Sequence, residues 1–121
     1  MIHIPKWTQR LFSQLYWRVH TSEKVLYLTF DDGPHPTITN WILDTLKEHH
    51  AKATFFCLGK NAELLPQIIS RIKTEKHTIG NHTYSHLKGW TTSNKKYFND
   101  IQEGQKNIDS TLFRPPYGQI S

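Results

Sequence analysis

Short apolar runs alternate with amphipathic stretches along most of this chain. Residues 24–30 and 53–58 are rich in apolar and β-branched side chains, and each run stops at a turn that contains glycine, so both are predicted to be buried strands. Residues 77–81 and 111–114 predict two shorter strands, the second of which is ended by a pair of prolines. The pattern therefore predicts four strands.

Three amphipathic stretches lie between the predicted strands. In residues 38–49, 64–72 and 97–108 the apolar side chains recur three or four positions apart, which predicts helices. Pro66 fits the second helix only in its first turn, because proline has no N–H to donate. The order β-α-β-α-β-α-β is typical of an α/β fold in which parallel strands form a sheet or barrel with the helices outside.

Residues 1–23 are predicted to form an N-terminal segment, and residues 24–121 to form the single domain that a chain of this length allows. We expect the segment to form a helix that packs an apolar stripe on the domain, and the alternative is that it lies on a membrane surface. The apolar residues of the stripe and the basic residues between them are Ile4, Trp7, Leu11, Phe12 and Leu15, with Lys6, Arg10 and Arg18.

The composition limits the class of protein. The 121 residues are 36% hydrophobic, which is typical of a soluble globular domain, and no apolar run is long enough to cross a bilayer. Residues 1–18 lack the apolar core and the cleavage site of a signal peptide, so a cytoplasmic location is the default expectation, with peripheral membrane association as the alternative. Cys57 is the only cysteine, which excludes an intramolecular disulfide. Nothing in the pattern predicts an oligomeric state.

Basic residues outnumber acidic ones by 15 to 10, which gives a net charge of +5. Such an excess suits an anionic polymer, but the basic residues are scattered and do not alternate with aromatic residues as they do in nucleic-acid-binding motifs. We therefore expect a solvated basic surface and no nucleic-acid partner. Of the eight histidines, six have no partner at metal-ligand spacing, and these are His3, His20, His35, His49, His50 and His77.

Candidate reactive side chains follow three of the four predicted strands. They are Asp31 and Asp32 after the first strand, His82 and His86 after the third, and Arg114 and Tyr117 after the fourth. Because the carboxyl ends of parallel strands meet at one rim of an α/β fold, we expect these segments to converge on a shared site.

The two histidines at this rim predict a metal site. His82 and His86 are four residues apart, so a helical turn would place both imidazoles on one face. With one aspartate they form a two-histidine, one-carboxylate set, as in catalytic sites for zinc, and the other aspartate can take a proton from a metal-bound water. Thr83 or Ser85 can hold the loop by hydrogen bonds. Taken alone, the histidines could be surface residues and the Asp-Asp-Gly-Pro stretch an ordinary turn.

The last motif supplies a fixed positive charge and a stiff turn. The guanidinium of Arg114 suits a carboxylate, and near Asp31 it would orient that side chain and stabilise its negative charge. Pro115 and Pro116 restrict the backbone, so the N–H of Tyr117 could point at a developing oxyanion. Taken alone, this motif is more typical of a strand end with a surface arginine followed by a loop.

Together the three motifs resemble those of the polysaccharide deacetylase family, which is carbohydrate esterase family 4 and is also called the NodB homology domain. Residues 29–34 (Thr-Phe-Asp-Asp-Gly-Pro) resemble its first motif, residues 82–86 (His-Thr-Tyr-Ser-His) its second and residues 114–117 (Arg-Pro-Pro-Tyr) its third. The resemblance implies a distorted (β/α) barrel that hydrolyses acetyl groups, chiefly N-acetyl groups, on a polysaccharide. Chitin oligomers, peptidoglycan and acetylated xylan all fit as substrates.

The resemblance also implies a divalent ion and its ligands. Asp32, His82 and His86 would bind the ion, with zinc as the first expectation and cobalt, nickel or manganese as ions that such a site also accepts.

The remaining roles that the resemblance implies are catalytic. Asp31 would be the base, Arg114 would tune it, and the backbone amide of Tyr117 would help to bind the oxyanion. The family's fourth motif, an Asp and a Trp at the acetyl pocket, is absent, as is its fifth, a Leu-x-His that supplies the general acid, and no histidine follows His86. We therefore expect an incomplete barrel, the N-terminal half to two-thirds of a family domain, that is inactive by itself.

Other functions remain as alternatives. The first is a non-catalytic remnant that binds carbohydrate or metal but lacks the general acid. The second is a hydrolase that uses Cys57 as its nucleophile, although a cysteine between Phe-Phe and Leu is more typical of a small buried apolar residue. The third and weakest is a basic nucleic-acid-binding protein.

Overall fold

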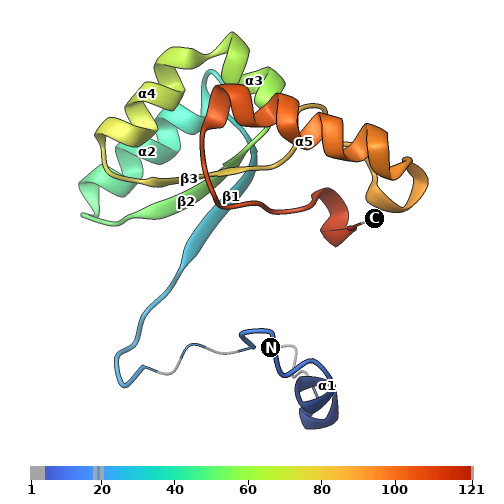
Figure 1. Ribbon diagram of the computed structural model, residues 1–121. Coiled ribbons are helices and arrows are strands. Elements are labelled where there is room, and N and C mark those ends of the chain that lie inside the picture. Colours follow the sequence, from blue (N-terminus) through green and yellow to red (C-terminus); the bar gives the residue numbers. More distant parts are fainter. Residues whose placement is uncertain (1–4, 18, 20, 121) are drawn as a thin grey trace.

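The computed structural model describes residues 5–17, 19 and 21–120. Its centre is a sheet of three parallel strands in the order β1 (Leu28–Gly33), β2 (Ala53–Cys57) and β3 (Thr78–Asn81) (Figure 1). β2 lies between the other two and is almost entirely buried, as its continuous apolar sequence predicts for a parallel strand. The predicted α/β class with parallel strands is confirmed.

The helices α2 to α5 lie on one side of this sheet in Figure 1. They are α2 (Ile38–Glu48), α3 (Gly59–Leu64), α4 (Pro66–Thr74) and α5 (Asn94–Ile108). The core lies between helices and sheet, where Leu43, Ile72 and Ile108 are fully buried. Burial of these apolar side chains holds the strands in a fixed position, so the residues at their carboxyl ends have a rigid support.

β1 differs from the predicted strand at both ends. It begins at Leu28 and not at residue 24, because Leu28 already pairs with Ala53, the first residue of β2, and residues 24–27 run beyond the end of that partner. At its other end β1 continues through Asp31 and Asp32. The two aspartates therefore lie within the strand and not, as predicted, after it.

The prediction of a fourth strand at residues 111–114 is wrong. In the described chain this segment makes a single parallel bridge, between Phe113 and Asn81 at the end of β3. The N–H of Arg114 donates to the carbonyl of Asn81 at 3.0 Å, and the two prolines that follow have no N–H with which to extend the ladder. The segment lies beside β3, where a fourth strand was expected, without forming one.

The predicted helices also need correction. The helix predicted over residues 64–72 corresponds to α4, which begins at Pro66, where a missing N–H costs nothing, and continues to Thr74. Leu64, the first residue of the predicted helix, is instead the last residue of α3. The preceding helix α3 was not predicted. The helix predicted for residues 97–108 begins three residues earlier, at Asn94.

The N-terminal segment contains a short helix, α1 (Lys6–Leu11), which Figure 1 shows apart from the sheet. No residue of α1 is buried, and the side chains of Trp7 and Leu11 are 68% and 69% exposed. The expected packing of the apolar stripe on the domain is therefore not seen, and the division at residue 23 stays a prediction. Four residues singled out in this region, Ile4, Arg18, His3 and His20, lie outside the described residues. Within the described chain, no helix has the length and apolar character needed to cross a membrane.

Candidate metal and active site

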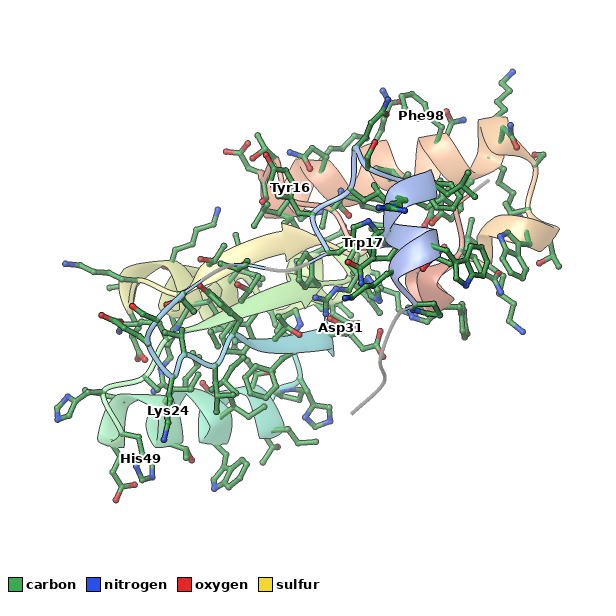
Figure 2. The ribbon with its side chains drawn as sticks, turned by 90° about the horizontal axis from the view of Figure 1, so that it is seen from below. Tyr16, Trp17, Lys24, Asp31, His49 and Phe98 are labelled. Atoms are coloured by element: carbon green, nitrogen blue, oxygen red, sulfur yellow. The ribbon has the colours of Figure 1, made fainter. Side chains whose placement is uncertain are left out.

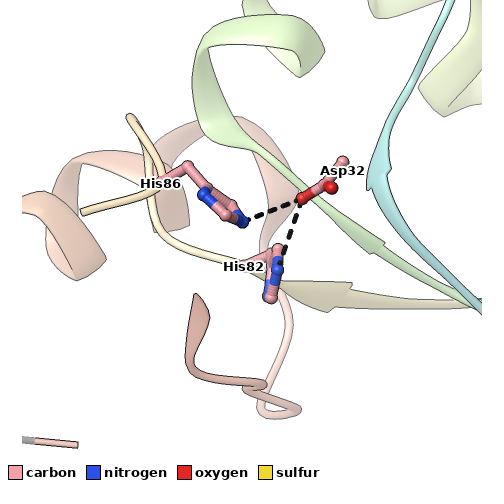
Figure 3. Close-up of side chains that lie close together, drawn as sticks. All are labelled: Asp32, His82 and His86. Carbon is pink, nitrogen blue, oxygen red and sulfur yellow. Dashed lines mark ion pairs between the residues drawn. The ribbon is translucent and has the colours of Figure 1, made fainter. Parts of the chain in front are cut away.

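Three side chains converge beside the carboxyl end of the sheet (Figure 3). The Nε2 atoms of His82 and His86 lie 3.5 Å and 3.0 Å from Oδ1 of Asp32. One ligand atom from each residue lies within 4.8 Å of the others. Two imidazole nitrogens and one carboxylate oxygen at this spacing fit a divalent ion held by three protein ligands, with room for a fourth.

A β-bulge brings both aspartates to this site. Asp31 pairs with Phe56 and Gly33 with Cys57, so Asp32 is an extra residue on β1, and its φ of 67° lies in the left-handed region. A regular strand would send two consecutive side chains to opposite faces. The bulge removes that alternation, and both Asp31 and Asp32 line the same pocket.

The ring of His82 has one fixed orientation. Its Nδ1 atom lies 2.6 Å from the carbonyl oxygen of Arg114, and a carbonyl can only accept, so Nδ1–H donates. The lone pair of Nε2 is then directed toward Asp32, as metal binding requires. Only 4% of the His82 side chain is exposed, so this ligand is held rigidly before any ion binds.

The loop from His82 to His86 is not the helical turn predicted from the four-residue spacing. Thr83 and His86 have φ values of 67° and 62°, which no right-handed helix contains. Within this loop the N–H of His86 donates to Oγ1 of Thr83 at 3.0 Å. Thr83 therefore holds the loop by a hydrogen bond, as predicted. The two imidazoles still meet, because a tight irregular loop brings them together.

Asp31 has a different partner from Asp32. Its Oδ1 accepts a hydrogen bond of 2.8 Å from Nη1 of Arg114, and the same nitrogen lies 3.0 Å from Oγ1 of Thr29. The guanidinium also lies over the ring of Phe56, 4.0 Å from its centroid. Arg114 therefore orients Asp31 next to the three candidate ligands. Figure 2 shows Asp31 near the carboxyl end of the strands.

Tyr117 closes one side of the site. It lies in a 3-10 turn, Pro116–Gly118, with a φ of 58°. Its ring packs edge-on against that of His86, with 4.7 Å between centroids. The site is an open cavity of about 550 Å³ lined by Asp31, Asp32, His82, His86, Arg114, Pro115, Tyr117 and Gly118. All six predicted site residues therefore line one pocket, and their individual roles stay predictions.

Comparison with known proteins places this arrangement in a family. The family model described as polysaccharide deacetylase matches residues 18–121. The chain belongs to the polysaccharide deacetylase family.

Similar members of this family are named as peptidoglycan deacetylases. A peptidoglycan-N-acetylglucosamine deacetylase of Bacillus cereus is 42% identical over 110 residues, covering 87% of this chain and 52% of the relative. The peptidoglycan-N-acetylmuramic acid deacetylase PdaC of Bacillus subtilis is 41% identical, covering 85% of this chain and 23% of the relative. The solved structure of PdaC superposes with a TM-score of 0.80 and covers 85% of this chain and 54% of that chain. The chain thus spans about half the length of the Bacillus cereus relative and about a quarter of the length of PdaC.

The alternative of a cysteine nucleophile is not supported by the position of Cys57. Its side chain is fully buried in the hydrophobic core. Burial raises the pKa of the Cys57 thiol to about 12, which disfavours the thiolate that a nucleophile needs. Cys57 is therefore a core residue of this polysaccharide deacetylase chain.

Several residues that hold the candidate ligands were missed by the sequence analysis. Nδ2 of Asn61, on α3, donates to the carbonyl of Asp32 at 2.9 Å and so supports the bulge. Asn81 is 2% exposed, and its Oδ1 accepts from the N–H of Thr83 at 2.8 Å. Asp100 on α5 binds the same loop. A polar residue directly before His82 was a usable signal for Asn81, whereas the contacts of Asn61 and Asp100 arise only from tertiary packing.

Proposed function

We propose that the full-length protein that carries this chain hydrolyses N-acetyl groups on a polysaccharide, with a divalent ion, zinc foremost, bound by Asp32, His82 and His86. The observation that supports this most strongly is the shared pocket. A three-residue ligand set and a separate carboxylate–arginine pair line the same cavity. This is the combination that metal-assisted hydrolysis needs, because one group of residues binds the ion and another handles the proton.

The three ligands offer a donor set suited to zinc. Imidazole nitrogens and a carboxylate oxygen suit zinc and, in the same geometry, cobalt, nickel or manganese. When bound, such an ion polarises the acetyl carbonyl and lowers the pKa of a bound water to about 7. Oδ1 of Asp32, which is near both imidazoles, is the carboxylate oxygen placed to join them.

We assign the role of base to Asp31. It lines the same pocket, and Arg114 holds it by a hydrogen bond of 2.8 Å without making it part of the ligand set. In the reaction, the water oxygen attacks the acetyl carbon and its proton passes to the carboxylate of Asp31. The hydrogen bond from Arg114 keeps this carboxylate oriented during the transfer.

The tetrahedral intermediate carries a negative oxygen, and the backbone N–H of Tyr117 is the donor assigned to it. Collapse of the intermediate breaks the C–N bond, releases acetate, and requires a proton on the leaving amine. Among the described residues that line the pocket, the only histidines are His82 and His86, both assigned to the ion. The general acid is therefore expected from a residue other than these two.

Peptidoglycan is the substrate class that we infer first. The similar proteins are named for N-acetylglucosamine and N-acetylmuramic acid in peptidoglycan, and the family membership of this chain is shown. The net charge of +5 is also compatible with an anionic cell-wall polymer. Chitin oligomers and acetylated xylan are the competing substrates, and the assay below includes them.

The test is release of acetate by the full-length protein after reconstitution with zinc or cobalt. Peptidoglycan, chitin oligomers and acetylated xylan are compared, with the chelated protein as the matched control. We expect metal-dependent acetate release, fastest with peptidoglycan. Binding of the ion without acetate release from any of the three would favour the alternative, a carbohydrate- or metal-binding remnant.

A further inference from the structure

We propose that Asp100, on α5, is a positioning residue that sets the affinity of the site for its ion by holding the loop that carries His86. The inference rests on the metal site proposed above. Asp100 does not line the pocket and contacts none of the three ligands directly. Its effect would pass through the loop residues Tyr84 and Ser85.

The side chain of Asp100 accepts hydrogen bonds from two consecutive residues of this loop. Its Oδ2 accepts from the N–H of Ser85 at 3.0 Å and from the N–H of Tyr84 at 3.1 Å. Its Oδ1 accepts from the hydroxyl of Ser85 at 2.6 Å. The N–H of Tyr84 is shared with the backbone carbonyl of Asp100, also at 3.1 Å, so the bonds that depend wholly on the side chain are those to Ser85.

These bonds matter because the loop conformation is unfavourable by itself. Thr83 and His86 both have positive φ values, and each non-glycine residue in that region costs about 1–2 kcal/mol. Such a loop persists only when its surroundings hold it. Ser85 directly precedes His86, so the bonds to Asp100 fix the backbone from which that imidazole extends.

The two histidines differ in how they are held. His82 is anchored by its own ring bond to the carbonyl of Arg114, and 4% of its side chain is exposed. The side chain of His86 is 24% exposed. Its ring contacts the edges of two other rings, those of Tyr117 and His82, and its Nε2 lies 3.0 Å from Asp32, the side chain with which it would share the ion. His86 is therefore the ligand whose position depends most on the loop, and on Asp100.

The close approach of α5 to the loop supports the same role. A Cβ on Gly104, one turn beyond Asp100, would lie 2.9 Å from Oδ1 of Asn81 and 2.9 Å from the carbonyl carbon of Thr83. Nδ2 of Asn81 in turn donates to the carbonyl of Ile101 at 2.9 Å. One face of α5 thus lies directly against the backbone that carries both candidate histidine ligands.

The experiment compares zinc affinity in wild type and variants by competition with a chromophoric chelator, together with the absorption spectrum of the cobalt-loaded protein. We expect Asp100→Ala to weaken zinc binding by about 10–100-fold, as loss of a supporting partner commonly does, and to change the cobalt spectrum. Asp100→Asn should restore most of the affinity. Its amide oxygen can accept from both N–H groups, while the Ser85 hydroxyl turns to accept from the amide NH₂.

Glu103→Gln is the matched control, because it also removes a carboxylate from α5. The carboxylate of Glu103 pairs with Lys106 at 2.6 Å and not with the loop. It should leave the zinc affinity and the cobalt spectrum unchanged.

If Asp100→Ala binds zinc as wild type does, with an unchanged spectrum, the inference is wrong while the metal site stands. If wild type itself binds no ion, the metal site is wrong and the inference with it. If Asp100→Ala does not fold, Ser85→Ala decides, since it removes only the 2.6 Å bond. Unweakened binding in that variant would overturn the inference.

Discussion

The carboxylate of Asp31 and the guanidinium of Arg114 are joined by a hydrogen bond of 2.8 Å across 83 residues of the chain. Asp32, the next residue after Asp31, faces His82 and His86 instead. Two adjacent carboxylates therefore have separate partners in one pocket. This separation is the observation behind the proposed division between proton transfer by Asp31 and metal binding by Asp32.

The substitution Asp31→Asn tests that division. The amide keeps the size of the side chain and can still accept from Arg114, but it cannot take a proton from water. We expect the full-length protein to keep its zinc stoichiometry and to lose about 10²–10⁴-fold of its acetate-release rate. Metal analysis and the acetate assay on one preparation measure both quantities.

Asp32→Asn is the matched control for this experiment, and it should lose the ion as well as the activity. If Asp31→Asn were the variant that lost its ion, the roles assigned to the two aspartates would have to be exchanged.

Cys57→Ser tests whether the thiol has any part in the chemistry. Because Cys57 is fully buried, a hydroxyl in its place should lower the free energy of unfolding by about 1–3 kcal/mol. The acetate-release rate of the folded protein should stay close to that of wild type. Cys57→Ala, which also lacks the thiol but buries no hydroxyl, should be active and more stable than the serine variant. Loss of activity in both variants with the fold intact would restore the cysteine nucleophile.

The sequence could predict which residues meet but not how the backbone brings them together. The meeting of Asp32, His82 and His86 followed from the shared rim of parallel strands and from the spacing of the histidines. The bulge at Asp32 could not be predicted, because an Asp-Asp-Gly-Pro stretch has the composition of a turn. Likewise the His82–His86 loop looked helical by spacing, yet its shape depends on bonds to distant residues such as Asp100.

The first and last residues of the strands also could not be predicted from the sequence. Residues 24–27 have the composition of a strand, but β1 begins only where β2 provides a partner, at Leu28. Residues 111–114 lie beside β3, yet the ladder stops after Phe113. The length of a strand depends on its register with the neighbouring strands, which apolar periodicity does not encode.

His77 should make the stability of the domain depend on pH. It is 7% exposed, and its pKa is lowered from its ordinary value, first by burial and then by the charge of Lys52, against an opposing effect of Glu75. Just below the ordinary histidine pKa of about 6.5, the unfolded chain therefore binds a proton that the folded chain does not. The free energy of unfolding should fall as the pH drops through this window.

Chemical denaturation at pH 7.5 and 5.5 measures the effect. His77→Asn is the informative variant, because its Oδ1 can replace Nδ1 in accepting the N–H of Ala53, a bond of 3.3 Å, without titrating. The variant should lose less stability than wild type between the two pH values. Equal losses in the two proteins would show that His77 does not contribute to the dependence.

The most direct test of the account is the zinc content of the purified protein and of three variants, Asp32→Ala, His82→Ala and His86→Ala. His49→Ala is the matched control, since His49 follows the last residue of α2 and Figure 2 shows it well apart from Asp31. We predict about one ion per chain in wild type and in the control, and loss of stoichiometric zinc in each of the three variants. Unchanged zinc content in all three variants would contradict the assignment of this site.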